Sequence, residues 1–297
     1  MRIFYIGKFG LEHNTENYVS HALKQEGHIV HKYHVKAISW THFKRVLETF
    51  NPEMVLFSKA YFAHVQKIIR YCHLKGIPSV CWQWDYFIGY RSNRPDQFWC
   101  DFLFTTDGGH DKEWEKMGAN HYLLRQGIHE PEAVQVEADF NKDTAFVGGP
   151  FGHPSRKKLI RWLHSQRRGG MDWIWYYDKR GMNLNKVLSQ TRIVIGDSYP
   201  GVNYWSNRIY EITGRGGFLL HPHTEGLEEE YQEGVHYVGY ERGNYKQLRE
   251  LIDHYLKEDF EREKVREAGF RHTKENYTYT HRVKTLLETV GLVPQPS

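Results

Sequence analysis

Short apolar runs alternate with longer amphipathic stretches along the first half of the chain. The apolar runs are continuous, whereas the longer stretches repeat their apolar residues at helical spacing. Strands buried on both faces are apolar throughout, which is typical of parallel sheets flanked by helices. The pattern therefore predicts an α/β domain with a parallel sheet. The predicted strands are RIFYIG (2–7), HIVHKYHV (28–35), MVLFSK (54–59), PSVCWQW (78–84), DFLFTTD (101–107) and HYLLR (121–125).

A polar, proline-containing stretch interrupts the alternation, and a second alternation of strands and helices follows it. Domains commonly contain roughly 100–200 residues, so a chain of 297 residues favours two domains. We predict an N-terminal domain at 1–128, a linker at 129–142 and a C-terminal domain at 143–277. Ligands of such sheets bind beyond the carboxyl ends of the strands, so we expect a cleft between two sheets to hold the functional site.

Charge and composition narrow the range of functions only slightly. Lys and Arg total 40 against 36 Asp and Glu, which gives a net charge of +4. This weak positive bias suits an anionic ligand, but the chain has no long basic block of the kind that indicates nucleic-acid binding. The three cysteines lack metal-ligand spacing, so we expect reduced, buried thiols and a cytoplasmic location. No apolar run approaches the roughly 20 residues of a transmembrane helix.

The first predicted strand ends in the turn GKFG, which contains Gly7 and Gly10. Glycines at a strand-to-helix turn let the backbone approach a ligand closely, so Gly10 is a candidate for nucleotide binding. The turn does not match the dinucleotide motif GxGxxG. A turn that binds no ligand explains the same glycines equally well.

A second candidate site lies in the segment YWSNRIYEITGRGGFLL, at 204–220. Arg208 and Glu211 are neighbours on one face of a helix because they are three residues apart. The guanidinium of Arg208 suits a phosphate, and the carboxylate of Glu211 suits two ribose hydroxyls. Asn207 precedes this pair, and Gly216 lets the following strand pack against the helix. An exposed ion pair on a solvated helix is the alternative interpretation.

The sequence predicts neither a metal site nor a nucleophilic hydrolase site. Zinc or iron needs clustered His, Cys or carboxylate ligands, and a metal-dependent sugar transferase usually carries an Asp-x-Asp pair. Neither pattern is present, and the HExxH, P-loop and GxSxG motifs are absent as well. We therefore expect no metal and no other cofactor.

Two aspartates and one histidine are candidates for acid–base chemistry. Asp85 and Asp107 each follow a predicted strand, at the end where ligands bind. Either aspartate could instead cap a helix, and Asp107 is the more typical cap because a helix follows it. His13 lies before the first predicted helix, where a neutral imidazole could take a proton from an acceptor. Among 19 histidines, a surface position is the simpler interpretation of His13.

The last third of the chain carries an ordered set of motifs. These are Arg-x-x-Glu (208–211), a glycine-rich turn into an apolar strand, an acidic helix in EGLEEEYQEG (225–234), a strand ending in Tyr, a Leu-rich helix, and a basic helix with Thr-Tyr-x-x-Arg. This order resembles the C-terminal domain of group 1 glycosyltransferases, and especially their CgeB-like, spore-maturation branch. CWQWDYF, FLFTTDGGHDKEWEKMGA and FVGG are more loosely similar to the same family.

The resemblance implies a GT-B fold, with two facing Rossmann-like domains, parallel sheets and a cleft between them. It also implies a final helix, 278–297, that joins the N-terminal domain. The implied reaction moves a sugar from a nucleotide-sugar donor to an acceptor hydroxyl without a metal.

The resemblance also assigns roles to particular residues. Glu211 matches the glutamate that holds the donor ribose, and Arg208 and Arg156 are the cations expected to stabilise the leaving diphosphate. If the reaction inverts the anomeric carbon, Asp85 is the first candidate for the base and His13 the second.

Asn203 departs from the family pattern, because related enzymes often carry a glutamate eight residues before the ribose-binding one. This departure keeps open a catalytically inert module that binds nucleotide sugars. A nucleic-acid-binding protein, including a transferase that acts on modified DNA bases, is a further alternative, because the pI is about 8.7 and aromatic residues are abundant. The acceptor stays open among glycan, protein, small molecule and modified DNA.

Overall fold

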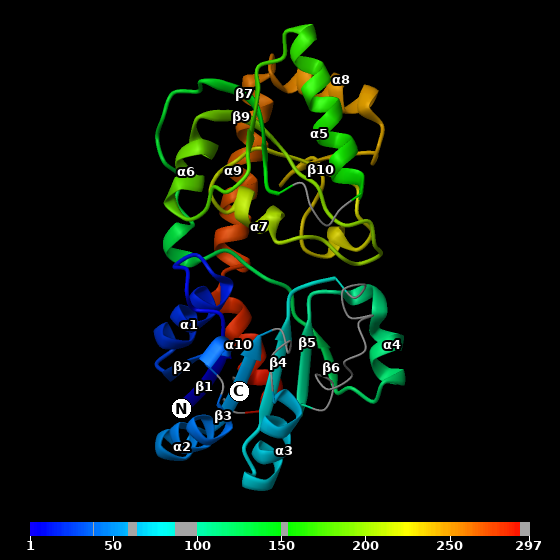
Figure 1. Cartoon of the computed structure of the whole chain (residues 1–297). Helices are drawn as coiled ribbons and strands as arrows, with labels where there is room; N and C mark the ends of the chain where they lie inside the picture. The colour runs from blue at the N-terminus through cyan, green and yellow to red at the C-terminus, as the bar shows by residue number, and fades with distance from the viewer. Residues whose placement is uncertain (38, 59–63, 87–99, 150–153, 292–297) are drawn as a thin grey trace. The chain divides into compact units, whose positions relative to one another are not determined.

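The computed structural model describes residues 1–37, 39–58, 64–86, 100–149 and 154–291 (Figure 1). The chain divides into two compact units. Unit 1 contains Met1–Gln126 and Tyr279–Ser297, and unit 2 contains Gly127–Thr278. Each unit has its own sheet and its own core.

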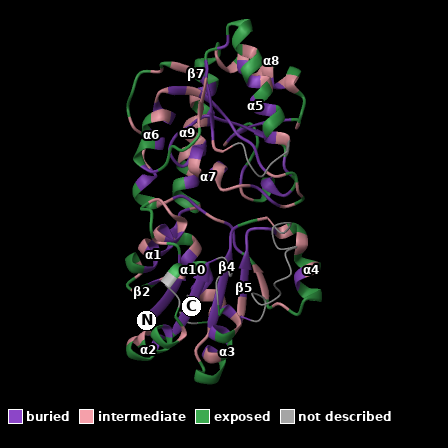
Figure 2. Cartoon of the chain, in the orientation of Figure 1, coloured by how far each residue is buried: buried purple, intermediate pink, exposed green. Residues whose placement is uncertain are grey.

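The described residues of unit 1 form a six-stranded parallel sheet in the order β2-β1-β3-β4-β5-β6. Most of its residues are buried, as the purple strands of Figure 2 show. The strands match the six apolar runs of the sequence, because helices cover both faces of the sheet. Their bounds are β1 (Arg2–Gly7), β2 (Ile29–His34), β3 (Met54–Ser58), β4 (Ser79–Gln83), β5 (Phe102–Thr105) and β6 (His121–Leu123).

Alternate residues of β1 point to two separate cores. Phe4 and Ile6 pack with α2, α3 and α4, whereas Ile3 and Tyr5 pack with α1 and α10. This alternation is the two-residue period of a strand with a helical layer on each face. The helices are α1 (Thr15–Gln25), α2 (Trp40–Phe50), α3 (Val65–Lys75), α4 (Asp111–Lys116) and α10 (Tyr279–Val290).

The last helix, α10, packs in unit 1 although it directly follows unit 2 in the sequence. Its Tyr279 ring lies 5.9 Å from the ring of Tyr18 on α1 and 6.3 Å from the ring of Trp82 on β4. The two segments that lead from one unit to the other pair with each other, since the Ile128 amide donates to the Tyr277 carbonyl at 2.9 Å.

The described residues of unit 2 form a five-stranded parallel sheet in the order β11-β10-β9-β7-β8. Helices α5, α8 and α9 cover one face, and α6 and α7 cover the other. The strands are β7 (Lys142–Val147), β8 (Trp173–Tyr176), β9 (Thr191–Ile195), β10 (Leu219–Pro222) and β11 (Val238–Tyr240). The helices are α5 (Pro154–Gln166), α6 (Met182–Ser189), α7 (Arg208–Thr213), α8 (Tyr245–Tyr255) and α9 (Asp259–Asn276).

Two segments differ from their sequence-based expectations. Residues 129–142, expected to be a linker, lie within unit 2, where Glu132 and Ala133 are buried and Asn185 donates to the carbonyls of Glu132 and Val134 at 2.8 Å. The expected acidic helix at 225–234 is only a single 3₁₀ turn, Leu227–Glu229. Glycines at both ends of that segment and its repeated like charges disfavour a longer helix.

Three further features concern the cysteines, the apolar length of the helices and the grouping of possible metal ligands. Cys72, Cys81 and Cys100 are buried, and none of these three described residues forms a disulfide. No helix in the described part of the chain is long and apolar enough to cross a membrane. Among the described residues, no group of three or more His, Cys, Asp or Glu side chains is arranged to hold a metal ion.

Candidate functional site

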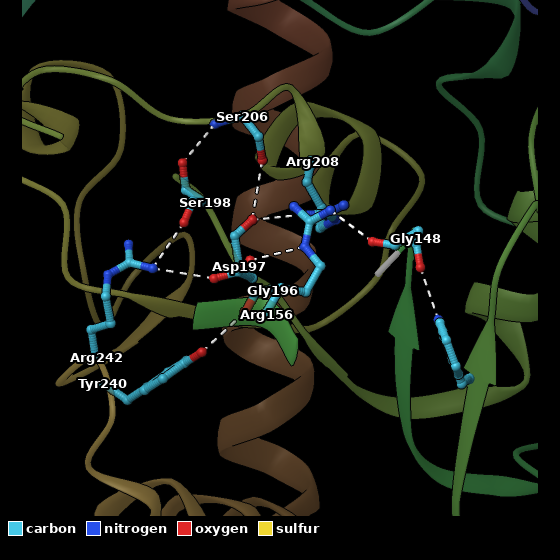
Figure 3. A network of polar contacts seen from close by, with 11 residues as sticks. Gly148, Arg156, Gly196, Asp197, Ser198, Ser206, Arg208, Tyr240 and Arg242 are labelled. Carbon is cyan, nitrogen blue, oxygen red and sulfur yellow. Dashed lines mark hydrogen bonds and ion pairs between the residues drawn. The ribbon is translucent and has the colours of Figure 1, made fainter. Parts of the chain in front are cut away.

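Three arginines converge on Asp197, which follows β9 at the carboxyl end of the sheet of unit 2 (Figure 3). Arg156 Nε donates to Asp197 Oδ2 at 2.9 Å, and Arg242 Nη1 donates to Oδ1 at 3.2 Å. Arg208 Nη1 donates to the main-chain carbonyl of Asp197 at 2.6 Å. The Asp197 side chain is only 3% exposed, so its charge acts in a weakly screened environment.

The arginines come from three different parts of the sequence. Arg156 lies in the first turn of α5, Arg208 begins α7, and Arg242 follows β11. Parallel strands bring the segments that follow their carboxyl ends to one edge of the sheet, where ligands of such sheets bind. The fold therefore brings three cations that are distant in sequence to one residue, Asp197.

Gly148 makes room for Arg208. It follows β7, and a Cβ atom at this position would lie 2.4 Å from Arg208 Nη2. Its φ of 131° is also a conformation that other residues rarely adopt. The guanidinium carbon of Arg208 lies 5.5 Å from the centroid of the Phe146 ring, and that of Arg156 lies 6.0 Å from it. The same ring therefore supports both cations.

The site carries more positive than negative charge. Among the described residues, Asp197 is the only carboxylate that forms an ion pair with Arg156 or Arg242, and Arg208 forms no ion pair. Burial, and next the charge of Arg156, lower the pKa of Arg208 to about 10. The guanidinium keeps its proton at neutral pH, so three cations face one anion. An excess of positive charge in a partly buried site favours binding of an anion.

Further hydrogen bonds hold the chain around Asp197 in place. Ser206 Oγ donates to the Asp197 carbonyl at 3.2 Å, and the Ser206 amide donates to Ser198 Oγ at 3.0 Å. Tyr240 donates its hydroxyl to the Gly196 carbonyl at 3.1 Å. These contacts tie the segment after β9 to β11 and to the segment before α7, so the arginines have a fixed anchor.

Glu211 belongs to a different polar group from Arg208, although both lie on α7. Arg215 Nη1 lies 2.5 Å from Glu211 Oε2, and the same guanidinium forms an ion pair with Glu132. Asn185 Oδ1 accepts from Arg215 Nε at 2.9 Å. Burial raises the pKa of Glu211. The expected neighbours Arg208 and Glu211 form no ion pair with each other, so the exposed-ion-pair interpretation is wrong.

Two other predicted donor-binding residues flank α7. Asn207 is the N-cap of the helix, but its side chain makes no capping hydrogen bond. Gly216 has a φ of 73°, and a Cβ atom there would lie 2.5 Å from Cγ of Gln135. Gly216 thus permits close packing of residues 127–141 in unit 2. The nucleotide-binding roles of Asn207 and Gly216 stay predictions.

The remaining candidates lie in unit 1, as predicted from their positions in the sequence. Asp85 follows β4 and is exposed, and His13 is half-buried in the segment between β1 and α1. Gly10 is exposed in the same segment. The proton-transfer roles of Asp85 and His13 and the nucleotide contact of Gly10 stay predictions.

Asp107 is confirmed as a cap, because its side chain accepts from the Gly109 amide at 3.1 Å. It also holds His110, whose Nδ1 lies 2.9 Å from both carboxylate oxygens. Since a carboxylate only accepts, His110 carries its proton on Nδ1 in the neutral form. Sequence reasoning did not single out His110, although the spacing Asp-x-x-His at the start of a helical segment is a signal for this pair.

Sequence reasoning also missed Asp197 and Arg242. Asp197 could have been noticed, because it follows the apolar run RIVIG at the end of a strand. Arg242 had no such signal, since it joins the site only through the pairing of β10 with β11. Arg208 and Arg156, which were predicted, are brought together on the same aspartate.

Comparison with known proteins identifies related sequences over part of the chain only. Residues 151–288 match the family described as glycosyl transferase-like, which is just under half of the chain. No curated protein sequence matches. The matched residues include the three arginines and Asp197.

Solved structures resemble nearly the whole chain. The Anabaena protein Alr3699/HepE in complex with UDP has a TM-score of 0.68 and 10% identity, and the match covers 99% of this chain and 100% of that chain. Sucrose-phosphate synthase from Thermosynechococcus elongatus has a TM-score of 0.68 and 8% identity, with 98% and 99% covered. A glycosyltransferase from Rickettsia africae has a TM-score of 0.60 and 10% identity, with 97% of each chain covered. The predicted GT-B fold, with two Rossmann-like parallel-sheet units, is confirmed.

Proposed function

We propose that the protein is a glycosyltransferase that moves a sugar from a nucleotide-sugar donor to an acceptor hydroxyl. The observation that carries the proposal is the set of three arginines around Asp197, which leaves a partly buried excess of positive charge. A diphosphate is an anion of suitable charge for this site. The glycosyl transferase-like family match over the same residues supports the proposal, as does the UDP bound to the Anabaena protein.

The donor diphosphate binds at Arg208 and Arg156 in this proposal. Their planar guanidinium groups form charge-assisted hydrogen bonds with phosphate oxygens. When the sugar leaves, negative charge develops on the diphosphate, and fixed positive groups lower the barrier by stabilising it. Because guanidinium groups supply this charge, the proposed reaction needs no metal.

The donor ribose binds at Glu211. Arg215 fixes Oε2 of this carboxylate and so presents its other oxygen in one orientation. A carboxylate can accept from both hydroxyls of a ribose, which gives the nucleotide a second anchor on α7. Glu211 and Arg208 are therefore expected to bind different parts of the same donor.

The acceptor side of the proposal lies in unit 1. If the reaction inverts the anomeric carbon, Asp85 is the first candidate for the base and His13 the second; if it retains the configuration, neither is needed as a base. Three buried cysteines that form no disulfide suit a reducing compartment, so we propose a cytoplasmic location. The CgeB-like branch of the family is likewise a proposal.

The test is a thermal-shift screen against UDP, GDP, ADP, CMP and dTDP sugars in the presence of EDTA. A ligand at about 100 times its Kd stabilises the protein by roughly 2.7 kcal/mol, which is a measurable shift. We expect Arg208→Gln and Glu211→Gln to weaken binding of the stabilising nucleotide by roughly 10- to 100-fold, through loss of charged hydrogen bonds. Arg271→Gln is the control, because Arg271 is 66% exposed and Glu267 is its only ion-pair partner in the described part of the chain.

Incubation with the same donor distinguishes an enzyme from a binding module. An enzyme should slowly release the free nucleotide diphosphate, which can be measured. Donor binding without release of the diphosphate, with or without an acceptor, would support a catalytically inert module. Failure of every nucleotide sugar to shift the melting of the folded protein would refute the proposal.

A further inference from the structure

Basic residues lie along α5 and the 3₁₀ turn that follows it, Arg167–Gly169. Lys157, Arg161, His164 and Arg168 are all exposed. At 100° per residue, the three positions within α5 fall within about 60° of one another and extend over about 10 Å, and Arg168 lies in the 3₁₀ turn that follows. Lys158 is exposed beside them. We call Lys157, Lys158, Arg161 and Arg168 the basic row; Figure 2 shows exposed residues in green along α5.

Acidic residues do not neutralise the basic row. Residues 144–171 contain neither Asp nor Glu. The acids at the two ends of this stretch have other partners, because Asp143 pairs with Arg192 at 2.8 Å and Asp172 pairs with Lys142 at 3.3 Å. Among the described residues, no carboxylate forms an ion pair with the basic row. Its charge is therefore free to act on a partner.

The inner side of α5 is packed firmly against the sheet of unit 2. Leu159, Ile160 and Leu163 are buried in the same core as β7 and β9. Arg156, next to the basic row in sequence, points instead to Asp197. The helix and the turn after it therefore present these charges in fixed positions, and a separate set of side chains serves the candidate donor site.

The geometry of the row favours a flat anionic surface over a nucleic acid. The aromatic residue of α5, Trp162, is stacked on Tyr245 at 5.0 Å between ring centroids, so it is not available to stack on bases. A membrane plane can contact several members of the basic row at once.

We propose that the basic row docks unit 2 on a membrane surface that contains anionic lipids. The described side chains of α5 offer no exposed large apolar group, so the contact is electrostatic and peripheral, without insertion. Each cation near an anionic leaflet contributes about a fivefold gain in binding, so the contact is cooperative across the row. The proposal is independent of the chemistry at the donor site.

The test is co-sedimentation of the full chain with two kinds of vesicle, one of phosphatidylcholine alone and one of phosphatidylcholine mixed with phosphatidylglycerol. We expect binding to the mixed vesicles only, and its loss near 1 M salt, where the Debye length falls to about 3 Å. The variant K157E/R161E/R168E should bind roughly 100-fold more weakly. It leaves Arg156 and the donor site intact.

The matched control is K257E/K264E/K274E, which changes the net charge equally at three other exposed lysines of unit 2. We expect this control to bind nearly as well as the wild type. Equal loss in both triple variants would overturn the proposal, because net charge alone would then explain binding. Absence of binding to the mixed vesicles would also overturn it. So would a competition experiment in which duplex DNA releases the bound protein at a lower phosphate concentration than added mixed vesicles do. If the triple reversal alters the cooperative melt, the neutral variant K157Q/R161Q/R168Q serves in its place.

Discussion

The buried carboxylate of Asp197 holds Arg156 and Arg242 in place through its two oxygens. Asp197→Asn keeps an acceptor at this position but removes the charge. We expect the free energy of unfolding to fall by about 3 kcal/mol, because breaking a buried ion pair leaves the partner cation uncompensated. Urea unfolding measures the loss, and inorganic diphosphate should restore part of it.

Asp143→Asn is the control for this prediction. Asp143 pairs with Arg192 at 2.8 Å, but about a third of each side chain is exposed. A pair with this exposure should contribute about 1 kcal/mol or less. Equal losses in Asp197→Asn and Asp143→Asn would contradict the assignment of Asp197 as the organiser of the cationic site.

We expect the free energy of unfolding to fall in mild acid because His221 is buried. Its Nδ1 donates to the Pro222 carbonyl at 2.9 Å, and Nε2 has no hydrogen-bond partner among the described residues. Burial lowers the pKa of His221 to about 4. An unfolded histidine has a pKa near 6.5, so between these values only the unfolded state takes the proton, and stability falls as the pH falls from about 6.5 to 4.

The loss from His221 alone should approach roughly 3 kcal/mol at the lower end of this window. Burial also lowers the pKa values of His121 and His236 to about 4, so they act in the same direction. Urea unfolding of wild type and His221→Asn across this pH range checks the prediction. The variant should show a shallower decline, and an unchanged slope would show that His221 is not the responsible group.

At the scale of elements, the close approach of α9 to the segment before β11 depends on Gly269. A Cβ atom on Gly269 would lie 2.4 Å from the main-chain oxygen of His236. Gly→Ala within a helix normally stabilises by about 1 kcal/mol. Here we expect Gly269→Ala to destabilise the protein by roughly 1–3 kcal/mol, because backbone must shift to make room.

Gly169→Ala is the matched control, since nothing lies within 4 Å of the Cβ position there. We expect it to be neutral or slightly stabilising in thermal melts. If Gly269→Ala stabilises the protein as much as Gly169→Ala does, then α9 can move away from His236 without loss of stability.

Most elements were predicted correctly from hydrophobic periodicity, and the exceptions have local causes. All six strands predicted in the first half are present, because both faces of that sheet are covered and its strands are apolar throughout. The acidic helix predicted at 225–234 was wrong, since Gly226 and Gly234 have positive φ and the chain forms one 3₁₀ turn. Local propensity was a weaker guide there than glycine geometry.

At the scale of the whole molecule, α10 is joined to unit 2 by the chain but packs in unit 1. Four of its side chains are buried in the unit 1 core: Tyr279, Val283, Leu286 and Leu287. Burial of each such side chain contributes roughly 1.5–3 kcal/mol, so their sum is comparable with the stability of a typical domain. Deleting 279–297 should therefore unfold unit 1 and leave unit 2 folded.

This prediction can be checked by measuring amide hydrogen exchange separately in each unit. Amides of β1, β3 and β4 should lose protection in the truncated chain, whereas those of β7 and β9 should keep it. Deletion of 292–297 alone is the control, because it leaves α10 complete. Retained protection in unit 1 after removal of α10 would contradict the prediction.

The candidate site was predicted only in part. Arg156 and Arg208 were both expected to bind a diphosphate, and the structure places both on Asp197. Glu211 was expected beside Arg208 on one face, but Arg215 draws it into a separate buried group with Glu132. Spacing along a helix shows which residues can be neighbours, but the charges packed against that helix decide which pairs form.

From the sequence alone we could predict the parallel α/β class, the six strands of the first half and two arginines of the candidate site. These features depend on local periodicity and on residue chemistry, both of which can be read along the chain. The tertiary structure was needed to show that Asp197 and Arg242 join Arg156 and Arg208. Parallel strands align the carboxyl ends of segments far apart in sequence, so the neighbours at that edge depend on the strand order, which local pattern does not encode.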